Sequence, residues 1–114
     1  MTDSCDLADK HCAPCSGDVP PLDRAEAESM LGQLDEAWRL NELGHLQRSY
    51  PFKNFMAALD FANTVGAIAE SEGHHPDLLV AWGRCGMEIW THKIDGLAEA
   101  DFILAAKADQ AYRS

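Results

Sequence analysis

The chain is poor in basic residues. Only 9 of its 114 residues are lysine or arginine, against 19 aspartates and glutamates, and the formal net charge is -10. Nucleic acids and anionic membranes are bound through clusters of lysine and arginine, so this composition argues against both as partners. Small uncharged molecules or other proteins are better candidates for its ligands.

Long hydrophobic runs are also missing. No apolar stretch approaches the roughly 20 residues that a membrane-spanning helix needs. The N-terminal segment carries Asp3, Asp6 and Asp9 where a signal peptide would have basic residues followed by an apolar core. We therefore expect a cytoplasmic protein with no membrane partner.

Cysteines are few, and three of the four, Cys5, Cys12 and Cys15, fall in the first fifteen residues. This distribution offers no framework of bridges across the chain, so reduced thiols are expected. Cys12 and Cys15 form a lone C-x-x-C without a second pair to complete four metal ligands, and an unliganded segment is favoured. Cys85 occupies a strand position typical of a small core residue.

The length and composition predict one globular domain. Hydrophobic residues make up 46% of the chain and charged residues 25%, which is ordinary for a soluble protein of this size. Residues 1–21 hold three prolines and Gly17 with little apolar content, so they are predicted to form a mobile N-terminal arm. The folded domain is predicted to span residues 22–114.

Three segments have the apolar spacing of amphipathic helices: 23–34, 53–72 and 98–112. Asp23 has the short polar side chain that caps a helix N-terminus, so the first helix is predicted to begin there. Gly73 can adopt the left-handed conformation that ends the second helix.

Four other segments alternate apolar and polar residues as strands do: 38–40, 46–52, 78–82 and 85–92, the last two joined by a turn at Gly83–Arg84. The order is helix, strand, strand, helix, strand, strand, helix. We therefore predict an α+β fold, a single-domain two-layer sandwich in which a four-stranded antiparallel sheet carries helices on one face.

Three of the five histidines fall in two short segments at the ends of predicted elements: His74 and His75, followed by Pro76, and His92. Imidazole has an unperturbed pKa of about 6.5, so it can donate or accept a proton near neutrality. Glu70 lies four residues before His74, a spacing that puts both side chains on one helical face, and we expect it to orient this imidazole. The cluster predicts an acid/base site, which His92 enters from the end of the last strand.

Several of these residues also have ordinary structural interpretations. Trp82 and Trp90 could supply flat walls for an aromatic ligand, but they and Trp38 are individually more typical of cores or interfaces. The His-His-Pro sequence alone can be a solvated turn, and Glu70 can be a surface acid. A zinc ion held by three histidines is disfavoured, because adjacent histidines in an extended turn point apart.

The sequence resembles the pterin-4a-carbinolamine dehydratase family over nearly the whole predicted domain. The resemblance rests on Trp38, Phe52-Lys53-Asn54-Phe55, Glu70-x-x-x-His74-His75-Pro76, Glu88-Ile89-Trp90-Thr91-His92, Gly96-Leu97 and Asp101-Phe102. The three histidines match the family's active-site histidines one by one. The family often has serine or threonine where Ala98 stands, so the last helix is expected to lack a side-chain cap.

The resemblance implies an antiparallel sheet covered by helices on one side and a hydro-lyase activity. Such enzymes remove the hydroxyl at carbon 4a of a 4a-hydroxytetrahydropterin as water, giving the quinonoid dihydropterin. They thereby recycle the cofactor of aromatic amino acid hydroxylases, with no metal or redox cofactor of their own.

The resemblance also implies a division of roles within the site. His74 and His92 would transfer protons, with Glu70 orienting His74. His75 would bind the pterin, and Trp38 matches an aromatic position near the family's site. Together with Trp82 as a candidate wall, these are the predicted substrate-binding residues.

Two alternatives to this activity stay open. One animal family member also stabilises dimers of a homeodomain transcription factor, and degenerate relatives assist assembly of the carbon-fixing carboxylase, so the domain could be a non-catalytic interaction module. It could also act on a different pterin, in molybdopterin metabolism. Because edge strands can pair across a two-fold axis and family members form dimers or tetramers, we expect a homodimer or homotetramer.

Overall fold

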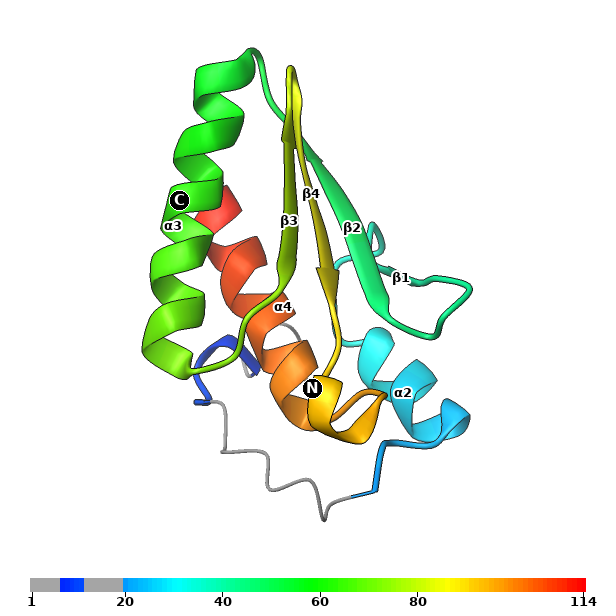
Figure 1. Cartoon of the computed structure of the whole chain (residues 1–114). Helices are drawn as coiled ribbons and strands as arrows, with labels where there is room; N and C mark the ends of the chain where they lie inside the picture. Colours follow the sequence, from blue (N-terminus) through cyan, green and yellow to red (C-terminus); the bar gives the residue numbers. More distant parts are fainter. Residues whose placement is uncertain (1–6, 12–19) are drawn as a thin grey trace.

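The computed structural model describes residues 7–11 and 20–114 and confirms the predicted α+β fold (Figure 1). Four antiparallel strands form one sheet in the order β1-β2-β4-β3. Helices α3 and α4 lie against one face of this sheet, and in the described part of the chain no helix covers the other face (Figure 1). The sheet and these helices are the two predicted layers.

The three helices lie close to the predicted positions: α2 is Arg24–Leu31, α3 is Phe55–Glu72 and α4 is Glu99–Arg113. Asp23 caps α2 as predicted, because its carboxylate accepts a hydrogen bond from the backbone N–H of Glu26. The Glu26 carboxylate accepts one in return from the N–H of Asp23. These reciprocal bonds satisfy donors that the first helical turn leaves without backbone partners.

Helix α3 ends as the sequence predicts, at Gly73, whose φ of 67° lies in the left-handed region. The N–H of Gly73 donates to the carbonyl of Glu70, and the N–H of His74 donates to the carbonyl of Ala69. This Schellman arrangement satisfies two of the last carbonyls of the helix. It also turns the chain out of the helix immediately before the two adjacent histidines.

The four strands are β1 Arg39–Leu40, β2 Leu46–Pro51, β3 Asp77–Ala81 and β4 Arg84–Ile89. All four predicted strand segments are therefore present. The turn between β3 and β4 falls at residues 82–83, one position before the predicted turn, and Gly83 supplies its positive φ of 81°.

Strand β4 is shorter than predicted, because it ends at Ile89 and not at His92. Ile89 pairs with Leu46, the first residue of β2, and β3 also begins at this end of β4. Beyond Ile89 neither neighbouring strand continues, and Thr91 instead forms an isolated bridge with Gly96. His92 therefore begins a short 3-10 helix at the end of the sheet.

The core lies between the sheet and helices α3 and α4. Alternate residues of β2 and β4 point towards the helices and are buried there: Leu46, Tyr50, Cys85, Met87 and Ile89. The prediction that Cys85 is a core residue is confirmed, and burial raises the pKa of its thiol.

A buried carboxylate joins the sheet to α4. Asp109 is fully buried and accepts hydrogen bonds from Trp38 Nε1 at 3.0 Å, Tyr50 Oη at 2.6 Å and Arg48 Nη1 at 2.9 Å. Burial first, and then the charge of Asp109, raises the pKa of the Tyr50 phenol, which therefore remains a hydrogen-bond donor. This cluster fixes Trp38 inside the domain.

Part of the predicted mobile arm is packed against the domain. Leu7 and Ala8 are buried, and the Ala8 carbonyl accepts a hydrogen bond of 2.7 Å from Lys107 Nζ. His11 Nδ1 bonds Glu72 Oε2 at 2.9 Å, at the end of α3. Residues 7–11 thus contact both long helices. The mobility of residues 1–21 and the division of the chain at residue 21 stay predictions.

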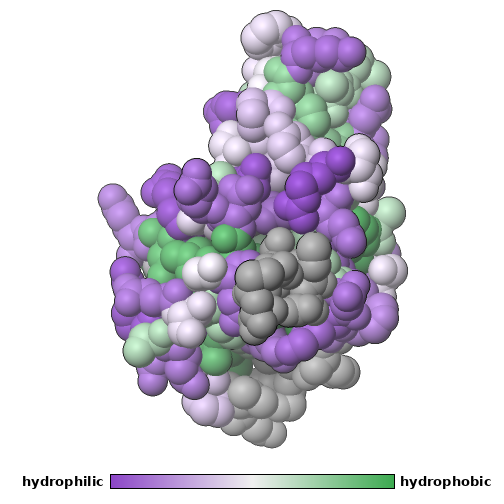
Figure 2. Space-filling model, turned by 180° about the vertical axis from the view of Figure 1, so that it is seen from behind, coloured by the Kyte–Doolittle hydropathy of each residue, from purple (hydrophilic) through white to green (hydrophobic). Residues whose placement is uncertain are grey.

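Hydrophilic residues predominate among the coloured residues on the face shown in Figure 2. On the face shown in Figure 2, hydrophobic residues gather in small separate patches between hydrophilic ones. Within residues 7–11 and 20–114, the exposed large apolar side chains are Leu43, Phe55, Met56, Leu79 and Trp82. None of the helices in the described ranges is long and apolar enough to cross a membrane.

Candidate functional site

A pocket of about 280 Å³ lies where α3 and β4 end together, at one end of the sheet. Two segments line it, residues 73–75 after α3 and residues 90–93 after β4. All three histidines singled out in the sequence, His74, His75 and His92, therefore meet at one cavity. The Gly73 turn and the early end of β4 bring them there.

His74 is held by a buried carboxylate on α4. Its Nε2–H donates to Asp101 Oδ1 at 2.5 Å, and Asp101 is fully buried. The other carboxylate oxygen, Oδ2, accepts from Thr91 Oγ1 at 2.8 Å and from the Ala98 backbone N–H at 2.7 Å. One side chain thus ties together the ends of α3 and β4 and the start of α4, and it fixes the His74 ring beside the pocket.

The expected pairing of Glu70 with His74 is wrong. Glu70 Oε1 accepts a hydrogen bond of 2.8 Å from His75 Nε2 instead. The four-residue spacing puts two side chains on one face only while the helix continues, whereas here the left-handed Gly73 lies between them. Both partners of the Glu70–His75 pair are exposed, so solvent screens the interaction and it fixes His75 only loosely.

His92 is exposed and stacks on Trp90, with ring centroids 4.2 Å apart and an interplanar angle of 28°. The opposite face of Trp90 carries His45, again at 4.2 Å and nearly parallel at 4°. His45 Nδ1 bonds Glu88 Oε2 at 2.7 Å. Hydrogen bonds from His45, and then from Asn41, hold the pKa of the Glu88 carboxyl below its ordinary value.

Two predicted substrate-binding residues lie away from this pocket. Trp38 is 3% exposed and bonds Asp109 in the core, and its family-based role near the site stays a prediction. Trp82 is exposed in the turn at the far end of β3 from His75, and a five-residue strand separates them by about 17 Å at 3.3 Å per residue. Trp90 is the tryptophan that lines the pocket.

Sequence reasoning passed over Asp101 as a site residue, although a signal for it was present. Ala98, at the N-cap of α4, has no side chain that can cap, and Asp101 stands at the third helical position. A carboxylate there can reach back to the N-cap backbone N–H, as Asp101 does. The capping oxygen could thus be inferred from sequence, but the contact of the second oxygen with His74 could not.

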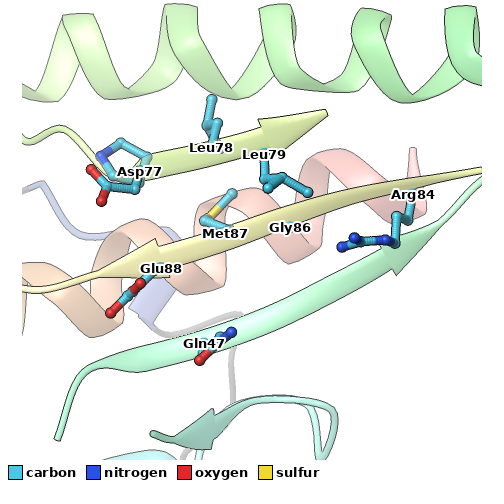
Figure 3. A pocket seen from close by; sticks show the side chains of 9 residues that line it. Gln47, Asp77, Leu78, Leu79, Arg84, Gly86, Met87 and Glu88 are labelled. Atoms are coloured by element: carbon cyan, nitrogen blue, oxygen red, sulfur yellow. The ribbon is translucent and has the colours of Figure 1, made fainter. Parts of the chain in front are cut away.

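A larger depression, of about 590 Å³, lies on the face of the sheet opposite the helices (Figure 3). Gly86 lies near its middle, with Arg84 towards one end and Asp77 and Glu88 towards the other. No histidine lines it, so it lacks a group that ordinarily exchanges protons near neutral pH. The histidine pocket is therefore the better candidate for an acid/base site.

The residues that the structure describes contain no group of three or more histidine, cysteine, aspartate or glutamate side chains arranged to hold a metal ion. The candidate ligands Cys5, Cys12 and Cys15 lie outside the described residues.

Comparisons with known proteins agree on one family. Residues 20–111 match the family model described as pterin 4 alpha carbinolamine dehydratase. A pterin-4-alpha-carbinolamine dehydratase named in Rickettsia bellii (strain OSU 85-389) is 56% identical over 109 residues, which cover 96% of each chain. A protein of the same name in Nitrosomonas europaea is 44% identical over 114 residues, with both chains fully covered.

A solved structure shares the fold. The crystal structure of a transcriptional coactivator/pterin dehydratase from Brucella melitensis superposes with a TM-score of 0.75 at 28% sequence identity. The match covers 80% of this chain and 97% of that one. The segment matched by the family model includes every residue that lines the histidine pocket.

Proposed function

This chain belongs to the pterin-4a-carbinolamine dehydratase family and is a hydro-lyase, and we propose that it acts on 4a-hydroxytetrahydropterin through its three clustered histidines. The product would be the quinonoid dihydropterin, which returns the cofactor of aromatic amino acid hydroxylases to use. The observation that carries this proposal is that His74, anchored by buried Asp101, and His92, stacked on Trp90, face one pocket.

The reaction needs two proton transfers. The hydroxyl oxygen on carbon 4a takes up a proton, the C4a–O bond breaks and water leaves. The proton on N5 is removed, and the electron pair of the N5–H bond forms the new C4a=N5 double bond. Hydroxide is a poor leaving group, so a general acid near the oxygen and a general base near N5 both lower the barrier.

His74 is the better base of the two. The Asp101 carboxylate fixes its ring through Nε2 and stabilises the positive charge that the imidazole gains when Nδ1 takes the N5 proton. His92 approaches the pocket from the other segment and donates the proton to the leaving oxygen. His75, exposed and paired with Glu70, binds the pterin ring at the rim. Trp90 lines the pocket as the ring on which His92 stacks.

The proposal predicts that the native chain forms the quinonoid product faster than the spontaneous dehydration. The product's absorbance, followed after 4a-hydroxytetrahydropterin is generated with and without the protein, measures both rates. Tetrahydropterins that differ in the side chain at carbon 6 would define the substrate in the same assay. If the native chain gives only the spontaneous rate, the catalytic proposal is wrong and a non-catalytic interaction module takes its place.

We also propose that the chain forms a homodimer or homotetramer. β3 pairs with β4 alone, and β1 at the opposite edge is only two residues long, so β3 is the longer open edge among the described strands. An open edge can pair with its own copy about a two-fold axis. Size-exclusion chromatography with light scattering is expected to give the mass of two or four chains, and a monomer at micromolar concentration would contradict this. A cytoplasmic location stays a prediction from the sequence.

A further inference from the structure

The three histidines of the pocket are held in different ways. His74 and His75 each bond a carboxylate, Asp101 and Glu70 respectively. The His92 ring makes no side-chain hydrogen bond within the described ranges and is held by its stack on Trp90. The position of His92 therefore depends on the position of the Trp90 indole.

His45 in turn packs against the face of Trp90 that does not contact His92. The two rings are nearly parallel, at 4° and 4.2 Å, and His45 is only 7% exposed. Rings at this distance are in van der Waals contact, so the indole cannot move back unless the His45 imidazole moves first. The three rings of His45, Trp90 and His92 form one continuous stack that ends at the pocket.

The first ring of the stack is fixed through both its side chain and its backbone. His45 Nδ1 bonds Glu88 Oε2 at 2.7 Å, and the same carboxylate oxygen accepts from Asn41 Nδ2 at 2.9 Å. The His45 N–H donates to Asn41 Oδ1 at 3.0 Å, and its carbonyl accepts from the Asn41 N–H at 2.9 Å. Glu88 lies on the open face of β4, beside the depression of Figure 3.

We propose that His45 and Glu88 are positioning residues for His92. Their hydrogen-bonded pair fixes one face of Trp90, and the other face of Trp90 holds the His92 imidazole at the pocket. The effect on the reaction rests on the proton-transfer role proposed for His92. The proposal adds to the site a pair of side chains that do not line the histidine pocket. His45 comes from the turn between β1 and β2, and Glu88 is the next-to-last residue of β4.

The test combines a spectroscopic signature with kinetics. Ring protons of His92 that lie over the indole face are shifted upfield, so NMR of the histidine rings in the full chain reports the stack directly. In His45→Ala the His92 signals are expected to lose most of this shift. kcat is expected to fall roughly tenfold with KM changed less than about threefold, since a catalytic group misplaced by about 1 Å can cost a hundredfold.

Two further variants separate stacking from general damage. His45→Phe keeps a flat ring against Trp90 and is expected to restore most of the His92 shift and of kcat. In a Trp90→Ala background, His45→Ala is expected to cause no additional loss of kcat, because the indole through which His45 acts on His92 is already absent. The matched control is His11→Ala, which removes a histidine that also bonds a glutamate, Glu72, but lies outside the pocket. It is expected to leave the His92 signals and kcat unchanged.

The proposal is overturned if His45→Ala leaves the His92 signals in place, whatever happens to stability. It is also overturned if His45→Phe loses most of the His92 ring shift seen in the native chain. That second comparison does not need a folded alanine variant. The NMR result does not depend on turnover. A native chain without dehydratase activity but with a His45-dependent His92 shift would therefore refute the proposed function and leave the positioning role intact.

Discussion

Replacing both His74 and His92 by glutamine is expected to return the dehydration of 4a-hydroxytetrahydropterin to its spontaneous rate. Glutamine keeps hydrogen-bonding capacity at each position but cannot exchange a proton near neutral pH. General acid and base groups each contribute about 10²- to 10⁴-fold, so each single variant is expected to lose at least about 100-fold in kcat. Because the two groups serve one transition state, the combined loss is expected to be smaller than the product of the single losses.

Two related variants make this result specific. His75→Gln is expected to raise KM roughly tenfold and change kcat less than about threefold, because a binding group that acts equally on substrate and transition state affects KM alone. Asp101→Asn is expected to lower kcat roughly tenfold, since it replaces a charge-assisted hydrogen bond to His74 with a weaker neutral one. Native kcat in His74→Gln would mean that the His74–Asp101 bond only joins the segment after α3 to α4.

The fold was predictable because its signals are local. The side chains of Asp23 and Asn54 cap the N-termini of α2 and α3, and Gly73 ends α3 with the positive φ that glycine accepts most easily. Strand alternation placed Cys85 in the core. The convergence of the histidines followed from the same signals, because the predicted ends of α3 and of the last strand could meet at one end of a two-layer fold.

The partners of the histidines were not predictable, because they depend on contacts distant in sequence. Asp101 reaches His74 across 27 residues and His45 reaches Glu88 across 43. The four-residue spacing rule that paired Glu70 with His74 failed because α3 ends before His74, at the left-handed Gly73. Glu70 therefore accepts a hydrogen bond from His75. His92 was assigned to a strand because the sequence of β4 continues to alternate, whereas the strand ends where β2 and β3 begin.

Replacing Asp109 by alanine is expected to lower the free energy of unfolding by about 3–5 kcal/mol, as for a buried ion pair that loses one partner. Asp109 is the common acceptor of Trp38, Arg48 and Tyr50, and all three donors lie in or beside the core. Without it the guanidinium of Arg48, whose side chain is only 9% exposed, loses its closest counter-charge. Domains of this size are stable by about 5–15 kcal/mol, so the loss is a large share of the total.

Urea unfolding followed by circular dichroism measures this loss, and Asp35→Asn is the matched control. Asp35 approaches the same Arg48 Nη1 at 3.5 Å, but its side chain is 42% exposed. Its removal is expected to cost less than about 1 kcal/mol, as for other solvent-screened pairs. Equal losses in the two variants would contradict this, because they would show that burial of the carboxylate does not determine how much its pair with Arg48 adds to the free energy of unfolding. A double variant, Arg48→Met with Asp109→Ala, is expected to recover part of the stability, because it leaves no unpaired charge in the core.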